Sequence, residues 1–452
     1  MVESAGPGEK KVALVSLGCP KNLLDSEVML GKLYEQGYTL TVDPVEADYL
    51  IVNTCGFIQS AKEESIEHIL EMAQIKAQYP GKKLVVAGCL AQRYGGELLQ
   101  ELPEVDALVG TGHFQHMPQV LVQLQTPLPQ REYLSNNAYL YQDSDRRIQT
   151  TPSHTAYVKI AEGCNHLCTF CIIPKMRGRL KSRPPESVVT EARSLGRAGV
   201  REVILIAQDS TEYATDLGIR HGLAHLLRRL GEEATEIDWL RVLYLYPSMI
   251  RPELLTVYAA QERLCKYFDM PMQHASDRLL RTMKRGYTQR TLCRLLDDIR
   301  QRLPDATIRS TFIVGFPGET PADVEALLRF LEQAQLDRVG VFTYSREEGT
   351  PSYHLPNHVP AREAARRRRE IMALQQEISW HKHQRLLGQQ TWALVDEEAT
   401  AERLAVGRLA SQAPDIDGVV YIDGPVTSGE LVRVEITGAQ AYDVSARAVT
   451  RP

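Results

Sequence analysis

The feature that most constrains this chain is an alternation of short, β-rich apolar runs with helix-length amphipathic runs. Up to about residue 125, the apolar runs "KVALVSLG", "ADYLIVNT" and "KKLVVAG" are separated by two helical patterns. The first pattern ends on Gly37, and the second is expected to begin with Ser60 as its N-cap and Glu63 three residues later. Alternation of this kind is typical of βα units that build a parallel sheet. We therefore expect residues 10–125 to form an open parallel α/β domain.

A second block of the same alternation follows residues 126–152, which have no sustained period and are expected to be a linker or a pair of short strands. Helical patterns, including one continuous stretch over 276–303, separate the strands of this block. Six βα units predict an incomplete (β/α)6 barrel, relative to the eight units of a full one, over residues 153–382. The six expected strands are "TAYVKIA", "VREVILIAQ", "WLRVLYLY", "KYFDMPMQ", "TIRSTFIVGF" and "RVGVFTYS".

The last part of the chain changes character again. A helical pattern over 361–388 carries Arg366 to Arg369, which are expected to form a solvated face with ion pairs to Glu363 and Glu370. A nucleic-acid-binding run is the alternative. After this helix, five short strand-like runs with Gly and Asp turns predict a small antiparallel β-barrel over 383–452.

The number of cysteines and the lengths of the apolar runs indicate the cellular compartment of the protein. Eight cysteines in 452 residues are too few for a disulfide scaffold. The first residues contain no apolar signal segment, and no run reaches the 18 apolar residues that a membrane helix needs. We therefore expect a cytoplasmic protein without membrane contact, in which clustered cysteines are ligands or catalysts.

Three cysteines, Cys164, Cys168 and Cys171, lie within eight residues directly after the first expected barrel strand. Three thiolates hold three irons of a [4Fe–4S] cubane and leave the fourth iron without a protein ligand, much as a catalytic zinc keeps an open position. The alternatives are a zinc knuckle and a cluster that a distant cysteine completes. Cys265 and Cys293 are the remaining candidates in this block, and ordinary packing explains them better.

A second set, Cys19, Cys55 and Cys89, is dispersed along the first block, but each member stands at the carboxyl end of an expected strand. The carboxyl ends of parallel strands lie along one edge of a sheet, outside which ligands bind. We therefore expect the three thiols to converge. Structural cysteines are the alternative, although these would more naturally fall inside the strands. A second three-cysteine cluster with its own open iron is the more economical interpretation.

The first triplet, with Phe170 before its last cysteine, resembles the radical S-adenosylmethionine (AdoMet) superfamily. That resemblance implies that the open iron binds the amino and carboxylate groups of AdoMet. The segment "IVGFPGET" at 313–320 is similar to the glycine-rich segment that lines the AdoMet site in this superfamily. The resemblance thus implies cofactor-binding roles for Phe170, Gly315, Gly318 and Glu319.

Both cysteine sets, followed by a small barrel that resembles the TRAM domain, make nearly the whole chain similar to the methylthiotransferases. The motifs "VSLGCPKNLLDSE", "CTFCIIPKMRGRLKSRP", "LIAQDS" and "DMPMQHASDR" resemble the branch that modifies an aspartate of protein twelve of the small ribosomal subunit. The transfer-RNA branch typically has Gln-Met-Asn where this chain has Pro20, Lys21 and Asn22. The resemblance implies catalytic roles for Gln208 and Asp209, but the chain departs from the branch's usual pattern directly after them, at "STEYATD".

This resemblance implies a radical mechanism that uses two [4Fe–4S] clusters and AdoMet. The cluster on the CxxxCxxC triplet would reduce AdoMet and release a 5′-deoxyadenosyl radical, and cluster potentials that reach roughly −700 mV suit that task. The cluster on the dispersed set would present sulfur, which a second AdoMet methylates before transfer to the substrate radical. An external electron donor and a sulfur source are implied as partners.

The charge of the terminal module bears on the substrate. Residues 388–452 contain five arginines and ten acidic residues, so this module has a net charge of −5. Phosphate binding requires basic residues that replace counterions, so this module is expected to repel transfer RNA and to attract a basic ribosomal protein. Acidity that serves only solubility is the alternative. Two other functions stay open, namely methylthiolation of an adenosine in transfer RNA and a non-enzymatic iron–sulfur electron carrier.

Overall fold

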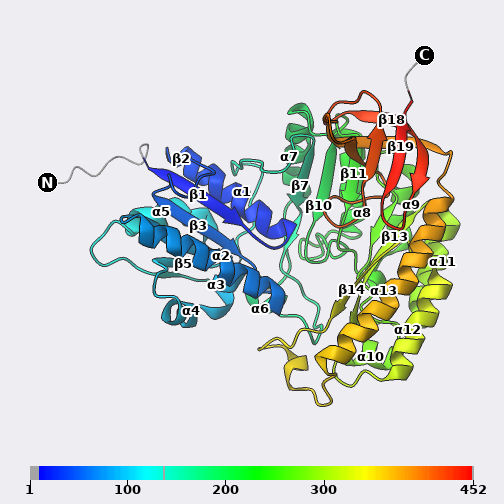
Figure 1. The fold of residues 1–452 in the computed structure, drawn as a ribbon, viewed down its shortest axis with the longest axis horizontal. Helices are drawn as coiled ribbons and strands as arrows, with labels where there is room; N and C mark the ends of the chain where they lie inside the picture. Colours follow the sequence, from blue (N-terminus) through cyan, green and yellow to red (C-terminus); the bar gives the residue numbers. More distant parts are fainter. Residues whose placement is uncertain (1–9, 136–137, 450–452) are drawn as a thin grey trace.

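The computed structural model describes residues 10–135 and 138–449, which form three adjoining bodies (Figure 1). The N-terminal body is built on a six-stranded sheet in which all neighbouring strands are parallel. This arrangement confirms the predicted open α/β domain. In sheet order, the strands are β2 (Thr39–Leu40), β1 (Lys11–Ser16), β3 (Tyr49–Thr54), β4 (Lys83–Gly88), β5 (Ala107–Val109) and β6 (Glu132–Tyr133).

Helices cover both faces of this sheet, which explains why β3 is buried along its whole length, and β4 at every residue after its first, rather than at alternate positions. Ile51 of β3 packs in one cluster with Leu24 and Val28, whereas its neighbours Leu50 and Val52 pack in another, on the opposite face. The helices are α1 (Pro20–Glu35), α2 (Gln59–Gln78), α3 (Cys89–Tyr94), α4 (Gly96–Glu101) and α5 (Met117–Gln123).

The start of α2 differs from the prediction. The helix begins at Gln59 with Ile58 as its N-cap, so the prediction of Ser60 as N-cap is wrong. The reason is a contact with a distant part of the chain, because the backbone N–H of Gln59 donates to Oγ of Ser345 at 3.2 Å. A hydroxyl from another element thus satisfies a free donor of the first turn, which a cap side chain would otherwise do.

The middle body consists of two three-stranded parallel sheets. An isolated parallel bridge between Leu240 and Leu264 joins them. The six predicted strands therefore form one open wall, as expected for an incomplete barrel. In sheet order, the strands are β11 (Trp239–Val242), β10 (Glu202–Ile206) and β7 (Thr155–Lys159), then β12 (Tyr267–Asp269), β13 (Thr307–Val314) and β14 (Arg338–Thr343), with β8 (Ala161–Glu162) and β9 (Lys181–Ser182) as a separate antiparallel pair.

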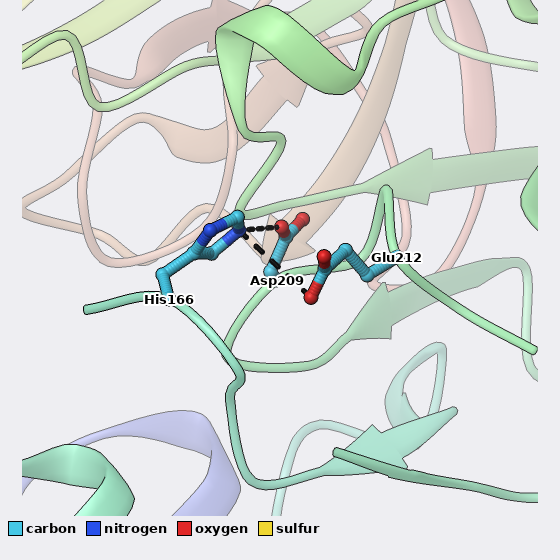
Figure 2. A group of neighbouring side chains, drawn as sticks. All are labelled: His166, Asp209 and Glu212. Atoms are coloured by element: carbon cyan, nitrogen blue, oxygen red, sulfur yellow. Dashed lines mark hydrogen bonds and ion pairs between the residues drawn. The ribbon is translucent and has the colours of Figure 1, made fainter. Parts of the chain in front are cut away.

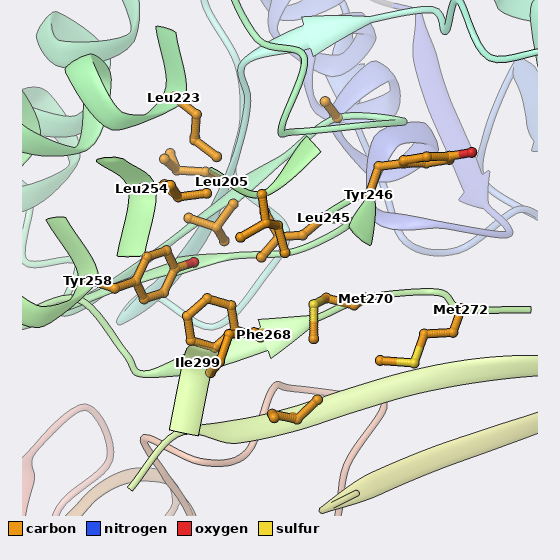
Figure 3. Close-up of a cluster of buried hydrophobic side chains, with 14 of the residues drawn as sticks. Leu205, Leu223, Leu245, Tyr246, Leu254, Tyr258, Phe268, Met270, Met272 and Ile299 are labelled. Carbon is orange, nitrogen blue, oxygen red and sulfur yellow. The ribbon is translucent and has the colours of Figure 1, made fainter. Parts of the chain in front are cut away.

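Helices pack against this wall and bury a large hydrophobic core (Figure 3). Leu205 and Phe268 from the strands meet Leu254, Tyr258 and Ile299 from the helices. Within the described ranges, no helix combines the length and the apolar composition that crossing a bilayer requires. The helices of this body are α6 (Ile173–Arg177), α7 (Pro185–Arg197), α8 (Gly222–Glu233), α9 (Pro252–Ala260), α10 (Asp277–Thr282), α11 (Gln289–Arg302), α12 (Pro321–Ala334) and α13 (Ala361–Gln384).

The expected continuous helix over 276–303 is two helices, α10 and α11. Lys284 and Gly286 between them have φ angles of 55° and 68°, a left-handed backbone that ends a helix. Thr288 then starts α11 as an N-cap whose side chain accepts the backbone N–H of Thr291. The apolar spacing continues across the break because Leu280 of α10 and Leu292 of α11 belong to the same hydrophobic core.

The terminal body is a closed five-stranded barrel, which confirms the predicted small β-barrel. Four of its five neighbouring pairs are antiparallel, and the pair of β17 and β19 is parallel. In barrel order, the strands are β15 (Gln390–Glu397), β16 (Ala405–Leu409), β17 (Val420–Asp423), β19 (Val444–Ala448) and β18 (Leu431–Ala439).

The arginine run on α13 is only partly as predicted. Arg366 forms the expected ion pairs, 2.9 Å from Glu363 and 2.8 Å from Glu370. Arg367 is buried, and its guanidinium lies 2.9 Å from Oε1 of Glu319, so the prediction of a solvated face is wrong for this residue. Adjacent helical residues point in different directions, and one of them turns inward here.

The three bodies meet at different ends of the barrel strands. The terminal barrel contacts amino ends, where Arg408 lies 2.6 Å from Glu202, the first residue of β10. The N-terminal body contacts carboxyl ends, where Asp25 of α1 pairs with Lys159, the last residue of β7. Residues 126–152 are expected to be a linker or a pair of short strands. Among their described residues, β6 joins the N-terminal sheet, and Ile148 lies beside α1, where its N–H donates to the carbonyl of Glu27 at 3.0 Å.

Candidate functional site

All six predicted ligand cysteines line one cavity of about 330 Å³ between the N-terminal body and the barrel. Cys19 is the N-cap of α1, Cys55 follows β3, and Cys89 begins α3 directly after β4. Because β1, β3 and β4 are neighbours, the structure brings these three thiols to one edge of the sheet. The approach is close, since a Cβ on Gly18, whose φ is +88°, would lie 2.7 Å from Cβ of Cys55.

The second triad lies on the loop between β8 and α6, on the barrel side of the same cavity. Backbone hydrogen bonds shape this loop, from the N–H of Cys164 to the carbonyl of Gly178 and from the N–H of Cys171 to the carbonyl of Cys168, both at 3.1 Å. The predicted site residues Phe170, Gln208 and Asp209 line the cavity as well.

The thiols have properties that suit metal ligands. Burial raises the pKa of Cys55, Cys164 and Cys171 to about 12, and it also raises the pKa of Cys89. Such thiols stay protonated at neutral pH unless a metal cation replaces the proton. Thiolate sulfur is the ligand that iron–sulfur clusters take, so the donor set fits one cluster on each triad.

The two other cysteines of the middle body do not complete either triad. Cys265 is buried in a hydrophobic cluster with Trp239 and Tyr267. Cys293 lies on α11 and packs against the barrel core. Neither lines the cavity, which agrees with the expectation that ordinary packing explains both.

Each triad receives a hydrogen bond from a buried arginine that the sequence analysis did not identify. Nε of Arg177 donates to Sγ of Cys89 at 3.3 Å, and Nη1 of Arg285 donates to Sγ of Cys168 at 3.2 Å. Hydrogen bonds to ligand sulfurs tune the reduction potential of a bound cluster. A sequence signal existed for Arg177, which stands in the quoted motif "CTFCIIPKMRGRLKSRP", but for Arg285 we find none.

Arg177 also belongs to a buried charge network that joins α1 to the barrel. Its Nη1 lies 2.9 Å from Oδ2 of Asp25 and 2.9 Å from Oε2 of Glu162. Lys159 binds the same two carboxylates. Burial by itself would raise the pKa of Glu162, but Arg177 and Lys159 hold it well below its usual range. Gln208 donates to Glu162, so the network reaches the cavity wall.

A polar cluster of His166, Asp209 and Glu212 lies beside the second triad (Figure 2). Nε2 of His166 lies 2.6 Å from Oδ2 of Asp209 and 3.9 Å from Oε2 of Glu212. The imidazole also stacks on the ring of Tyr246, with the ring centroids 3.8 Å apart. Asp209 is therefore held by a histidine of the cysteine loop, and its catalytic role stays a prediction.

The glycine-rich segment lies outside the cavity lining. Gly315, Gly318 and Glu319 follow β13, and the carboxylate of Glu319 accepts the N–H of Gly315 at 2.6 Å and binds Arg367. This carboxylate thus stabilises its own turn. The cofactor-binding roles of the three residues stay predictions, and it is Thr311 of β13 that lines the cavity.

Two further residues of the wall, Lys21 and Tyr244, were not predicted as site residues. Lys21 lies in the first turn of α1, is 7% exposed, and places Nζ 2.9 Å from the centroid of the Tyr244 ring. Burial lowers the pKa of Lys21 to about 8. Lys21 stands two residues after Cys19, which was a usable signal, whereas Tyr244 comes close only through the fold.

The chain matches three family models along its length. Residues 11–110 match the model described as "Uncharacterized protein family UPF0004", residues 158–331 match the radical SAM superfamily, and residues 387–449 match the TRAM domain. Among solved structures, the radical S-adenosylmethionine methyltransferase TsrM from Kitasatospora setae has a TM-score of 0.57 over 76% of this chain and 77% of that one. At 15% sequence identity, that likeness shows a shared fold alone.

Relatives with much higher identity cover almost the full length. The ribosomal protein uS12 methylthiotransferase RimO of Trichlorobacter lovleyi is 45% identical over 444 residues, which cover 98% of each chain. RimO of Desulforamulus reducens is 46% identical over 96% of this chain and 98% of the relative, and RimO of Anaeromyxobacter sp. (strain K) is 47% identical over 98% and 94%. This chain therefore belongs to the RimO family of ribosomal protein uS12 methylthiotransferases, which carry a radical SAM domain.

Proposed function

We propose that this chain transfers a methylthio group to the β-carbon of an aspartate in ribosomal protein uS12, with two [4Fe–4S] clusters and AdoMet as cofactors. The observation that carries this proposal is the single cavity of about 330 Å³ that both cysteine triads line. Cys164, Cys168 and Cys171 would hold the cluster that binds AdoMet, and Cys19, Cys55 and Cys89 would hold the second. When bound, the first cluster supplies an electron to AdoMet and the second supplies sulfur.

The chain's own residues prepare the space between the triads. Arg177 and Arg285 donate hydrogen bonds to one cysteine of each triad, and both guanidinium groups are buried. Phe170 and Tyr246 contribute aromatic surface to the cavity wall. The mainly apolar lining limits the water around the reacting groups, and excluding competing reactions in this way is the protein's main task when a cofactor carries the chemistry.

The surface of the terminal barrel supports a basic protein as substrate. Its buried Arg408 is used in contacts with Asp396 and Glu202 and is not free to bind phosphate. Acidic residues outnumber arginines among the exposed side chains of the described part of this barrel. The exposed residues are Glu397, Glu398, Glu402, Asp415, Asp423 and Glu430 against Arg403, Arg433 and Arg447. An acidic surface attracts a basic partner and repels RNA.

Two partners and a compartment complete the proposal. Each turnover removes sulfur and electrons from the enzyme, so an external electron donor and a sulfur source must restore them. All eight cysteines are free thiols, which fits a reducing compartment, and we place the reaction in the cytoplasm.

The decisive experiment offers both substrates to the anaerobically reconstituted protein. With reductant and AdoMet, we expect mass spectrometry to find the methylthio mass on uS12 and none on transfer RNA. The variant with Cys19, Cys55 and Cys89 replaced by Ala should still cleave AdoMet but transfer no methylthio group. Cys293→Ala, a thiol outside the cavity, is the matched control and should transfer normally.

The alternatives predict different results. A methylthio mass on transfer RNA only would select the RNA-modifying function. Absence of AdoMet cleavage by the reduced protein would select an electron carrier. Full transfer by the triple variant would refute the assignment of the second triad.

A further inference from the structure

The cavity wall contains a cation, Lys21, that forms no ion pair with any of the described residues. Among the described residues, no side chain or backbone group forms a hydrogen bond or ion pair with Nζ of Lys21, although only 7% of the residue is exposed. The other two cations of the wall are fully used. Arg177 binds Asp25 and Glu162, and Arg285 donates to Cys168 and to a backbone carbonyl.

The ring below Lys21 is held in an unusual backbone conformation. Tyr244 has a φ of +63°, a left-handed value that is disfavoured for a residue with a large side chain. Its N–H donates to Oδ2 of Asp269 at 3.0 Å, and its carbonyl accepts the N–H of Ser210 at 2.9 Å. These bonds keep the ring face under the ammonium group, which lies 2.9 Å from the ring centroid.

A ring face attracts an ammonium group but does not neutralise it. A buried charge without a counter-ion is unfavourable, and a carboxylate that reaches it gains a charge-assisted hydrogen bond in a site shielded from water. Three carboxylates lie near Lys21 or in the cavity wall, and each already has a partner. Asp269 is paired with Arg309, and Glu162 with Lys159 and Arg177. Asp209, the acid of the cavity wall, is bonded to His166. The carboxylate that completes this site therefore comes with a ligand.

We propose that Lys21 binds the side-chain carboxylate of the substrate aspartate and so selects aspartate over its neutral analogue. This inference rests on the proposed function. Lys21 lies in the first turn of α1, two residues after Cys19, and thus on the side of the triad that would supply sulfur. A carboxylate held there would bring the adjoining β-carbon toward that triad. AdoMet also carries a carboxylate, and the test must separate the two sources.

The test measures binding of uS12, and of uS12 with its target aspartate replaced by Asn, to the reconstituted protein with AdoMet present. Loss of a hydrogen bond to a charged group changes affinity by roughly 10- to 100-fold, so we expect the wild type to prefer Asp by that factor. Lys21→Met should remove the preference, and Lys21→Arg should restore part of it. Lys32→Met, the same change on the same helix at a residue paired with Asp145, should keep it.

Several results would overturn the inference. Equal binding of both uS12 forms by the wild-type protein would overturn it. This result needs no variant of the enzyme, so it decides the question even if Lys21→Met fails to bind its clusters. A preference that survives in Lys21→Met would also do so. Weakened AdoMet binding by Lys21→Met, with the Asp preference intact, would assign the site to the AdoMet carboxylate. If the wild type never modifies uS12, the proposed function itself fails, whereas normal modification without Asp preference removes only the role of Lys21.

Discussion

Replacing Arg177 by Met tests the charge network that joins α1 to the barrel. Arg177 is 3% exposed and lies 2.9 Å from both Asp25 and Glu162, with a further donation to Sγ of Cys89 at 3.3 Å. Met keeps most of the side-chain volume but removes every donor. Among the described residues, Lys159 then remains as the only cation bound to the two carboxylates.

The magnitude follows from what is left behind. Two buried carboxylates that share one cation carry an excess negative charge in a low-dielectric interior. Breaking a buried ion pair by removing one partner costs about 3–5 kcal/mol, mostly because the other charge stays buried and unpaired. We therefore expect Arg177→Met to lower the free energy of unfolding by about this amount. The loss should become smaller as the pH falls from 4.5 toward about 2, because Glu162 takes up a proton over this range.

Urea unfolding of the protein without metal, followed by circular dichroism, measures this loss. Arg366→Met is the matched control, since Arg366 forms two ion pairs on the surface and exposed pairs contribute little. Unchanged unfolding midpoints for Arg177→Met would refute the reasoning. In the reconstituted protein, the same variant should shift the midpoint potential of one cluster to more negative values, because a donor to a ligand sulfur is lost.

Two other positions give sharp predictions. Nδ1 of His274 accepts the N–H groups of Ala275 and Ser276 at 2.9 Å, and burial lowers the pKa of His274 to about 4. Because the pKa of histidine in the unfolded chain is near 6.5, the free energy of unfolding should fall as the pH drops below that value, by about 2 kcal/mol at pH 5. His274→Asn, whose oxygen can accept the same hydrogen bonds, should reduce this difference between pH 7 and pH 5 in urea titrations. An unchanged difference would contradict the assignment. Gly315→Ala should lower the free energy of unfolding by about 1–3 kcal/mol, since the φ of Gly315 is +75° and the new Cβ would lie 2.5 Å from Cβ of Ala364. Gly81→Ala, with φ of +100° and open space, isolates the backbone contribution, so equal losses in both variants would exclude the steric contact.

Much of the fold was predictable because it depends on local patterns. Most strands of the sheet and of the barrel wall are short β-rich runs with several apolar residues, and helical or turn patterns separate them along the sequence. The convergence of Cys19, Cys55 and Cys89 was predictable for a different reason. The carboxyl ends of adjacent parallel strands must share one edge, and this rule needs no knowledge of side-chain packing.

The failures arose where a distant residue decides a local feature. Ser60 has the right chemistry for an N-cap, but Ser345 from the loop after β14 bonds the helix start one residue earlier. Arg367 stands in a run that looks solvated, yet the buried carboxylate of Glu319 draws it inward. The roles of Lys21 and Tyr244 depend on two bodies of the chain meeting, which periodicity and spacing do not encode.

The central claim is that the two cysteine triads each hold a [4Fe–4S] cluster at one shared cavity. Iron and acid-labile sulfide analysis of the anaerobically prepared protein tests it most directly. We expect about eight irons per chain, and about four when either triad alone is replaced by Ala. About four irons in the unaltered chain, or zinc in place of iron, would contradict the account.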